Sequence, residues 1–322
     1  MRSPVQAFRR CNTRTTLAAA MAAAAAVALP VVASGQTQTP APAPAPAPDQ
    51  TAVAVNLNIT PKRLVLDRGT RAGTVYIFNQ GNAPATFDIA LVERVMLPNG
   101  EIKAVAETRG DPQLQPIVAR LASAQPMLVA TPRRATLAPG RGQTIRIRAM
   151  QPASGAGEYR THLTVTTVPP RESGVTAEQA QIQASGQLSF RISSVFGLSI
   201  PIIVRPGPVD VRGAIDNARL TTADLSPDGV APAVPTPVLR LDVARLGANS
   251  MFGNVEVRSV RGREREVLGL ARGIGVYPEI DRRTMQIPLR RAPRAGEQLE
   301  IVFTDDDSSP GRVIARSVLT AS

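Results

Sequence analysis

The feature of this sequence that most constrains its fold is a repeated alternation of apolar and polar residues with a period of two. The first example runs from Val53 to Ile59, where valine, leucine and isoleucine occupy every second position. Successive side chains of a β-strand point to opposite faces, so this pattern predicts strands with one buried face. Similar segments recur roughly every ten residues, separated by turn residues such as those at 80–82, as in a β-sandwich.

The predicted strands form two groups, divided by Pro206-Gly207-Pro208, a composition typical of a domain boundary. Strands of the first group are expected over 53–59, 64–66, 74–79, 86–92, 127–130, 135–137, 143–148, 158–168, 188–193 and 199–204. Strands of the second group are expected over 238–244, 253–257, 285–289, 299–303 and 313–319. Residues 112–124 are compatible with a short helix and 169–187 with a long loop. The sequence therefore predicts an all-β protein with two β-sandwich domains in tandem, at 52–207 and 208–322.

The first 35 residues have the composition of a secretory signal peptide. Residues 1–16 contain four arginines and no acidic residue, and residues 17–33 are apolar and rich in alanine. Cleavage after Ala33 or Gly35 fits the small-residue rule for such peptides. The alternative is an uncleaved anchor, but a run this short that contains Pro30 is poorly suited to span a bilayer. We therefore predict that the chain is exported and has no stable membrane insertion.

Residues 36–51 contain an alternating Ala-Pro segment, for which we expect an extended linker. Proline lacks the backbone donor, so this segment can build neither a helix nor a central strand. Removal of the leader would remove Cys11, the single cysteine, and leave a mature chain without disulfides. It would also lower the formal net charge from +12 to +8, because four of the 37 basic residues lie in the leader.

The residues that most enzymes need are scarce in this sequence. His162 is the single histidine and lies in a predicted strand, where a packed or surface position is more common than a catalytic one. No thiol remains in the mature chain for catalysis or metal binding, and there is no phosphate-binding glycine loop or nucleophile elbow. The acidic run at 305–307 lacks the spacing of a calcium loop, so we expect a solvated turn there. We therefore predict a protein that is not an enzyme and holds no cofactor or metal.

The positive charge of the chain does not indicate a nucleic-acid-binding protein. The basic runs at 261–265 and 290–291 lack aromatic residues that could stack on bases. A charged face that attracts acidic surfaces is the simpler interpretation. Tryptophan is absent and only 7 Phe and 3 Tyr are present, which also disfavours a sugar-binding protein.

A set of segments in the first domain occurs in a characteristic order. The segments are the first strand at 59–66, the strand and turn at 74–85, the stretch at 131–140 with 143–146, the strand at 157–170 and the end of the domain at 204–206. In this order and spacing they resemble the periplasmic chaperones of pilus assembly. The resemblance covers roughly residues 55–208. The second domain is compatible with the same family.

The resemblance implies immunoglobulin-like sandwiches, a periplasmic location and a function in capping pilus or fimbrial subunits, with an outer-membrane usher as a possible further partner. A subunit of this kind lacks its last strand, and the chaperone donates a strand with alternating apolar residues to fill the groove. Leu188, Phe190 and Ile192 provide that alternation in this chain. The alternative is that these three side chains fill the core of their own domain.

The resemblance also implies two basic residues that bind the terminal carboxylate of the subunit through charge-assisted hydrogen bonds. Arg63 stands at the first of these positions, although a solvated surface arginine would match the pattern equally well. The second position lies four residues before Arg205 and is occupied by Pro201, which is a departure from the family.

Two other classes of function remain open. A structural or adhesive module of a surface fibre would use the same sandwich but bury both faces of the strand at 188–192. A chaperone would instead leave that strand accessible at an edge beside a cleft. A periplasmic enzyme or sugar-binding protein is the least favoured class, because catalytic side chains and aromatic platforms are not evident in the sequence.

Overall fold

The computed structural model describes residues 56–150, 157–169, 195–261 and 264–321. Contacts between residues separate Met1–Thr51 from a larger unit, Ala52–Ser322, to which every described residue belongs. The predicted signal peptide at 1–35, the predicted linker at 36–51 and the predicted donor residues Leu188, Phe190 and Ile192 lie outside the described residues. Within the described part, no helix is long and apolar enough to cross a lipid bilayer.

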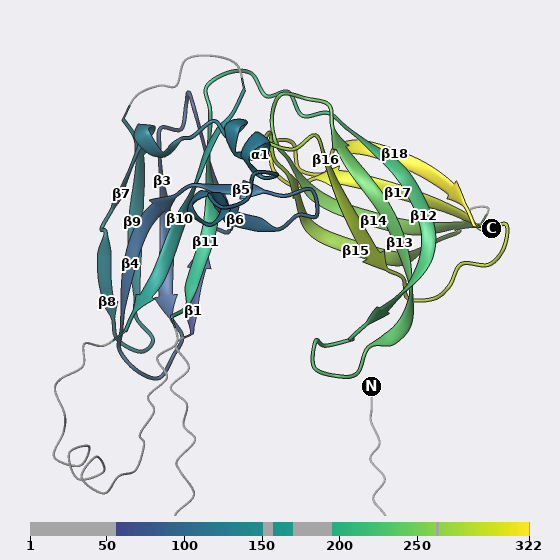
Figure 1. The fold of residues 1–322 in the computed structure, drawn as a ribbon, viewed down its shortest axis with the longest axis horizontal. Helices are drawn as coiled ribbons and strands as arrows, with labels where there is room; N and C mark the ends of the chain where they lie inside the picture. Colours follow the sequence, from purple (N-terminus) through teal and green to yellow (C-terminus); the bar gives the residue numbers. More distant parts are fainter. Residues whose placement is uncertain (1–55, 151–156, 170–194, 262–263, 322) are drawn as a thin grey trace, which may run out of the picture. The chain divides into compact units, whose positions relative to one another are not determined.

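The first part of the larger unit, up to Arg205, is built mainly from short strands (Figure 1). Their bounds are β1 (Leu57–Thr60), β2 (Leu64–Asp67), β3 (Ala72–Asn79), β4 (Ala85–Val92), β5 (Arg94–Met96), β6 (Ile102–Ala104), β7 (Leu128–Thr131), β8 (Arg134–Leu137), β9 (Gly142–Ala149), β10 (Tyr159–Val168) and β11 (Gly197–Arg205). Between β6 and β7 lie the helical turns η1 (Val105–Thr108), α1 (Gln115–Ala119) and η2 (Gln125–Met127).

These strands form a sandwich of two sheets and one small hairpin. The sheets have the orders β1-β3-β9-β7 and β2-β11-β10-β4-β8, and β5 pairs with β6 alone. The pairs are antiparallel, except that β2 runs parallel to β11. The chain thus changes sheets between β1 and β2, and the remaining order is that of an immunoglobulin-like sandwich.

The core of this sandwich is filled by every second residue of the strands. Val75 and Ile77 of β3 pack with Ile145 and Ile147 of β9, and all four are fully buried. The residues between them point outward, as the exposed Arg146 does. The alternation in the sequence therefore predicted the buried face correctly, because the two faces of a strand alternate with the same period.

The second part of the unit is a second sandwich, from β12 to β18 (Figure 1). Its strands are β12 (Gly213–Leu225), β13 (Val234–Arg245), β14 (Met251–Arg261), β15 (Glu264–Val276), β16 (Arg282–Pro288), β17 (Gln298–Asp305) and β18 (Val313–Thr320). They form sheets with the orders β12-β13-β16 and β15-β14-β17-β18. No described sheet combines strands from both sandwiches, and the prediction of two immunoglobulin-like sandwiches in tandem is confirmed.

The core of the second sandwich also receives side chains from the first. Leu241, Val257 and Phe303 belong to its own strands and are fully buried. Ile203 of β11 and Met96 of β5 join the same cluster, with exposed fractions of 0% and 3%. Apolar burial therefore continues across the junction between the two sandwiches.

A hairpin inserted between β4 and β7 makes further contacts with the second sandwich. Its turn is the Pro-Asn-Gly sequence at 98–100, where Gly100 has a φ of 88°, which favours glycine. The backbone carbonyl of Pro98 accepts a hydrogen bond of 2.8 Å from the backbone N–H of Thr284. The backbone N–H of Met96 donates to the carboxylate of Glu279 at 2.7 Å.

Most strands predicted from the sequence are present with small shifts at their ends, and α1 lies inside the segment expected to be helical. The sequence analysis missed β5, β6, β12 and β15. Strand β15 contains several charged or glycine residues, and only five of its 13 positions are buried. Strand β12 is similar, so neither shows the clean alternation that identifies a half-buried strand.

Candidate functional site

One half of β11 has a free edge. The parallel strand β2 covers β11 from Ile202 to Arg205, whereas Gly197–Pro201 pair with β10 on one side alone within the described residues. An unpaired edge presents backbone donors and acceptors that can hydrogen-bond to another chain. Continuing the register of β2 by one residue places Arg63 opposite Pro201, so the free edge ends where Arg63 begins.

The direction of the backbone groups follows from the pairing with β10. The carbonyl of Phe196 accepts a hydrogen bond of 2.8 Å from the N–H of Thr167. Because bonded and non-bonded pairs alternate in an antiparallel ladder, Gly197 and Ser199 direct their backbone groups toward the free edge. Pro201 has the same direction, so its missing N–H removes no bond to β10. The edge thus offers two N–H donors before the proline.

The side chains of β11 form an apolar ladder that leaves the core at its N-terminal end. Ile200 and Ile202 are buried in the first sandwich, with exposed fractions of 2% and 0%. Leu198 is only partly buried, and Phe196, just before the strand, is 55% exposed. A small pocket of about 190 Å³ lies beside this end, lined by Asn56, Leu57, Thr167, Phe196, Gly197 and Leu198.

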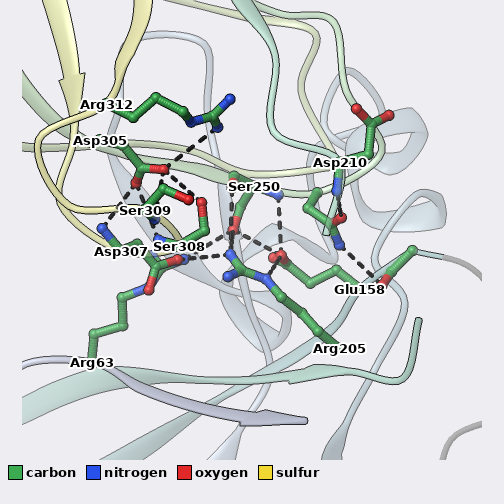
Figure 2. Close-up of polar contacts among 12 residues, drawn as sticks. Arg63, Glu158, Arg205, Asp210, Ser250, Asp305, Asp307, Ser308, Ser309 and Arg312 are labelled. Atoms are coloured by element: carbon green, nitrogen blue, oxygen red, sulfur yellow. Dashed lines mark hydrogen bonds and ion pairs between the residues drawn. The ribbon is translucent and has the colours of Figure 1, made fainter. Parts of the chain in front are cut away.

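The Arg63 side chain is largely buried and is not the solvated surface group that the sequence allowed as an alternative. Its side chain is 9% exposed, and its guanidinium carbon lies 4.9 Å from the centre of the Phe252 ring. Its Nη2 donates to the hydroxyl of Ser250 and to the carboxylate of Asp307, each at 3.0 Å (Figure 2). Its Nε and Nη1 are buried and have no hydrogen-bond partner among the described residues.

Arg205 lies beside Arg63 and shares two of its partners (Figure 2). Its Nη2 donates to Asp307 at 2.8 Å and to the hydroxyl of Ser250 at 3.2 Å, and its Nε donates to Glu158 at 3.0 Å. Burial disfavours the charge of Arg205, but the carboxylates of Glu158 and Asp307 outweigh it and raise the pKa of the guanidinium. A single oxygen of Asp307 therefore accepts hydrogen bonds from two cations.

The acidic run at 305–307 is not the solvated turn that we expected. Asp305 is 2% exposed, and its carboxylate accepts backbone N–H bonds from Asp307, Ser308 and Ser309. Of the three carboxylates, only that of Asp306 belongs to an exposed residue. Asp307 pairs with Arg63 and Arg205, whose side chains are 9% and 3% exposed. In the described residues, no group of histidine, cysteine and acidic side chains is arranged to hold a metal ion.

His162 is a packed residue, which was one of the two positions expected for it. It lies in β10 with an exposed fraction of 3%, and the edge of its ring faces Tyr277. Neighbouring Arg160 forms a buried ion pair with Glu279. Burial, followed by the charges of Arg160, Arg94 and Arg63, lowers the pKa of His162 from 6.5 to about 2. The ring therefore stays neutral over the physiological pH range.

The structure thus brings together some of the predicted site residues and adds others. Extension of the β2–β11 register by one residue places Arg63 opposite Pro201 at the end of the free edge. Leu188, Phe190 and Ile192 lie outside the described residues. The sequence analysis missed the hydrogen-bond partners of Arg63, which are Ser250 and Asp307. It also missed that Arg205 binds the same two groups and is held by Glu158. Arg205 could have been suspected, because it ends an apolar strand at a position that faces away from the first core.

Comparisons with known proteins give likenesses to solved structures alone. No family model matches the chain, and no curated protein sequence matches it. The E. coli chaperone DraB is 12% identical, with 83% of this chain and 97% of that chain covered and a TM-score of 0.40. A CsuC–CsuE chaperone–tip subunit pre-assembly complex from Acinetobacter baumannii gives 12% identity, coverages of 83% and 98% and a TM-score of 0.40.

A third solved structure, Salmonella enterica SafA pilin in complex with the SafB chaperone, gives 12% identity, coverages of 83% and 97% and a TM-score of 0.39. These three structures contain chaperones, and two of them are complexes of the chaperone with a subunit.

Proposed function

We propose that this chain is a periplasmic chaperone that binds and caps pilus or fimbrial subunits by adding a strand to their incomplete sandwich. The observation that carries the proposal is the free edge of Gly197–Pro201, which has an apolar ladder emerging from the core at one end and a buried arginine at the other. A second strand can bind such an edge through backbone hydrogen bonds while alternate side chains supply specificity.

In the sequence, apolar residues with the same spacing of two precede β11. Phe196 and Leu198 occupy even-numbered positions, on the face that becomes the core at Ile200. Leu188, Phe190 and Ile192 have the same parity, so an extended chain would place them on the same face. We propose these three residues as the donor side chains that fill the groove of a subunit.

The far end of the edge suits a chain terminus. Strand β2 already occupies the edge of β11 from Ile202 onward, so an added strand has to stop at that point. Arg63 lies there with two buried and unpartnered guanidinium nitrogens, whose burial without a partner costs free energy. A terminal carboxylate would supply acceptors for these donors, and we propose Arg63 as its anchor.

Asp307 occupies part of this anchor in the structure described here. Its carboxylate binds Arg63 and Arg205 together, so it holds the guanidinium groups in place and partly neutralises them. We propose that Arg205 positions Arg63 through this shared carboxylate and takes over the place of the basic residue that Pro201 does not provide. The same proposal includes export by a cleaved leader and an outer-membrane usher as a further partner. It also includes that the protein is not an enzyme.

The test is copurification from periplasm with the tagged full chain, followed by identification of the bound proteins. We expect pilus subunits to copurify, and we expect the double variant Phe190→Asp with Ile192→Asp to lose them while its melting temperature stays unchanged. The matched control is Ser189→Asp with Ser193→Asp, which adds the same charges at positions of opposite parity. Equal capture by both double variants would show that the apolar ladder is not the binding element. Recovery of no subunit by the unchanged chain would favour a structural or adhesive module of a surface fibre.

A further inference from the structure

The outer face of the sheet β1-β3-β9-β7 carries positive charges and aromatic side chains without any acid. The four strands contain no aspartate or glutamate. Arg146 and Arg148 of β9 are exposed on this face, opposite the small residues Thr74 and Ala72 of β3. Their neighbours on β7, Thr131 and Val129, are also uncharged, so no carboxylate lies directly across the sheet from either arginine.

These charges are available to a ligand. Arg146, Arg148 and Lys62 form no ion pair with any carboxylate of the described residues. On the other sheet, by contrast, exposed Arg134 is held by Asp88 in a paired hydrogen bond. An unpaired cluster of one sign attracts anions at a range that depends on salt.

Next to the arginines, Tyr76 and Phe78 of β3 form an aromatic platform. Their ring centres are 6.4 Å apart and their planes differ by 27°. Tyr76 is 42% exposed. The Tyr76 ring lies over Gly142 of β9, where a Cβ atom would come within 2.1 Å of the phenol oxygen. The absence of a side chain at Gly142 therefore allows the tyrosine ring to pack directly against the backbone of β9.

The platform is one wall of a shallow groove of about 380 Å³, whose lining is completed by Asn58, Ile59, Thr60 and Lys62. The Lys62 ammonium group donates to the Asn58 side-chain oxygen at 3.3 Å, so a cation and an amide meet beside the rings. This volume is at the small end of the range for small-ligand sites.

We propose that this face binds an acidic polysaccharide chain. The apolar side of a sugar ring packs against flat aromatic rings, while amide, hydroxyl and ammonium groups bind its hydroxyls. Arginine binds carboxylates with two parallel hydrogen bonds. Arg146 and Arg148 are two residues apart on one strand face, a distance of roughly 7 Å, which allows them to contact carboxylates farther along the same chain. The site is distinct from the free edge of β11 and does not depend on strand donation.

The test uses the purified full chain and calorimetric titration with polygalacturonate, a polymer with a carboxylate on every ring, and with neutral dextran. We expect binding of polygalacturonate alone. The affinity should fall roughly tenfold or more in Tyr76→Ala and in Arg146→Glu with Arg148→Glu, a change equivalent to about 1.4 kcal/mol or more. Melting temperatures check that each variant is folded. The matched control is Arg240→Glu, which reverses another exposed arginine, on β13 of the second sandwich.

Each remaining outcome would overturn the proposal. Absence of polygalacturonate binding would do so directly. An equal loss in the Arg240 variant, or no effect of Tyr76→Ala, would indicate attraction by net charge rather than a built site. Binding of polyglutamate with equal affinity and equal sensitivity to the variants would assign the face to an acidic protein partner instead.

Discussion

At the scale of single residues, the junction of the two sandwiches is organised by buried charges. Arg63 and Arg205 come from the first sandwich, and Asp307 and Ser250 come from the second. A buried ion pair adds little net stability compared with apolar packing, but removal of one partner is costly. We infer that these contacts define how the anchor residues are placed more than how stable the protein is.

His162 gives a prediction for pH dependence. Its pKa is 6.5 when exposed and about 2 in the folded protein. Between these values the unfolded chain binds a proton and the folded chain does not, so stability falls as the pH drops below 6.5. The expected contribution is about 1.4 kcal/mol of unfolding free energy per pH unit. Urea unfolding at pH 6.5, 5.5 and 4.5 measures it.

The control for this prediction is His162→Gln, which keeps a planar polar group but cannot titrate. The carboxylates contribute equally to the pH dependence of both proteins, because the substitution leaves them in place. His162 is the only histidine of the sequence, so the difference between the two proteins reports on its ring alone. The unchanged protein should lose stability more steeply on acidification than the variant. Parallel curves of unfolding free energy against pH would mean that folding does not lower the pKa of His162.

At the scale of elements, β11 combines two functions in one strand. Its C-terminal half is covered on both sides and buries side chains on both faces, with Ile202 in one core and Ile203 in the other. Within the part of the chain that the structure describes, its N-terminal half pairs with β10 alone. Free edges are aggregation hazards that proteins usually keep short or interrupt with proline, and Pro201 meets that description.

Replacement of Ser199 by proline tests the edge directly. The Ser199 N–H points to the free edge, so Ser199→Pro should leave the ladder with β10 largely intact but remove one of the two donors available to an added strand. We expect capture of pilus subunits to fall by roughly tenfold, and copurification measures it. Ser199→Ala loses the same contact with the Thr164 hydroxyl but keeps the N–H, so it should still capture subunits. A loss of capture in both variants would assign the effect to the hydroxyl.

At the scale of the whole molecule, the two sandwiches share buried surface. Met96 and Ile203 pack in the core of the second sandwich although both come from the first. The exposed pair of Arg120 and Asp281 adds a surface contact whose energy is expected to be small, below about 1 kcal/mol. We propose a domain boundary at 207–208 along the chain, but the shared packing predicts that the sandwiches unfold together.

Calorimetry of the full chain tests this coupling. We expect one transition with equal calorimetric and van't Hoff enthalpies, because separation of the sandwiches would expose Met96 and Ile203. Met96→Ala should destabilise that transition by about 2–5 kcal/mol. Met150→Ala, at a position that is 63% exposed, should change it by less than about 0.5 kcal/mol. Two separate transitions in the unchanged protein would rule out the coupling.

The sequence by itself determined the fold class and most of the strands, because a half-buried strand shows its faces in the period of its own residues. It also singled out Arg63 and the unusual Pro201. The contacts of Arg63 were decided only by the tertiary structure, since its carboxylate partner is 244 positions away and no local pattern records that distance. The same holds for Asp307: its acidic run predicts a solvated turn, but in the fold it pairs with Arg63 and Arg205. It also holds for Tyr76, Arg146 and Arg148, which the register of β3 and β9 places on one face of the sheet. Periodicity is a property of neighbours along the chain, whereas a site is made by residues that only folding brings together.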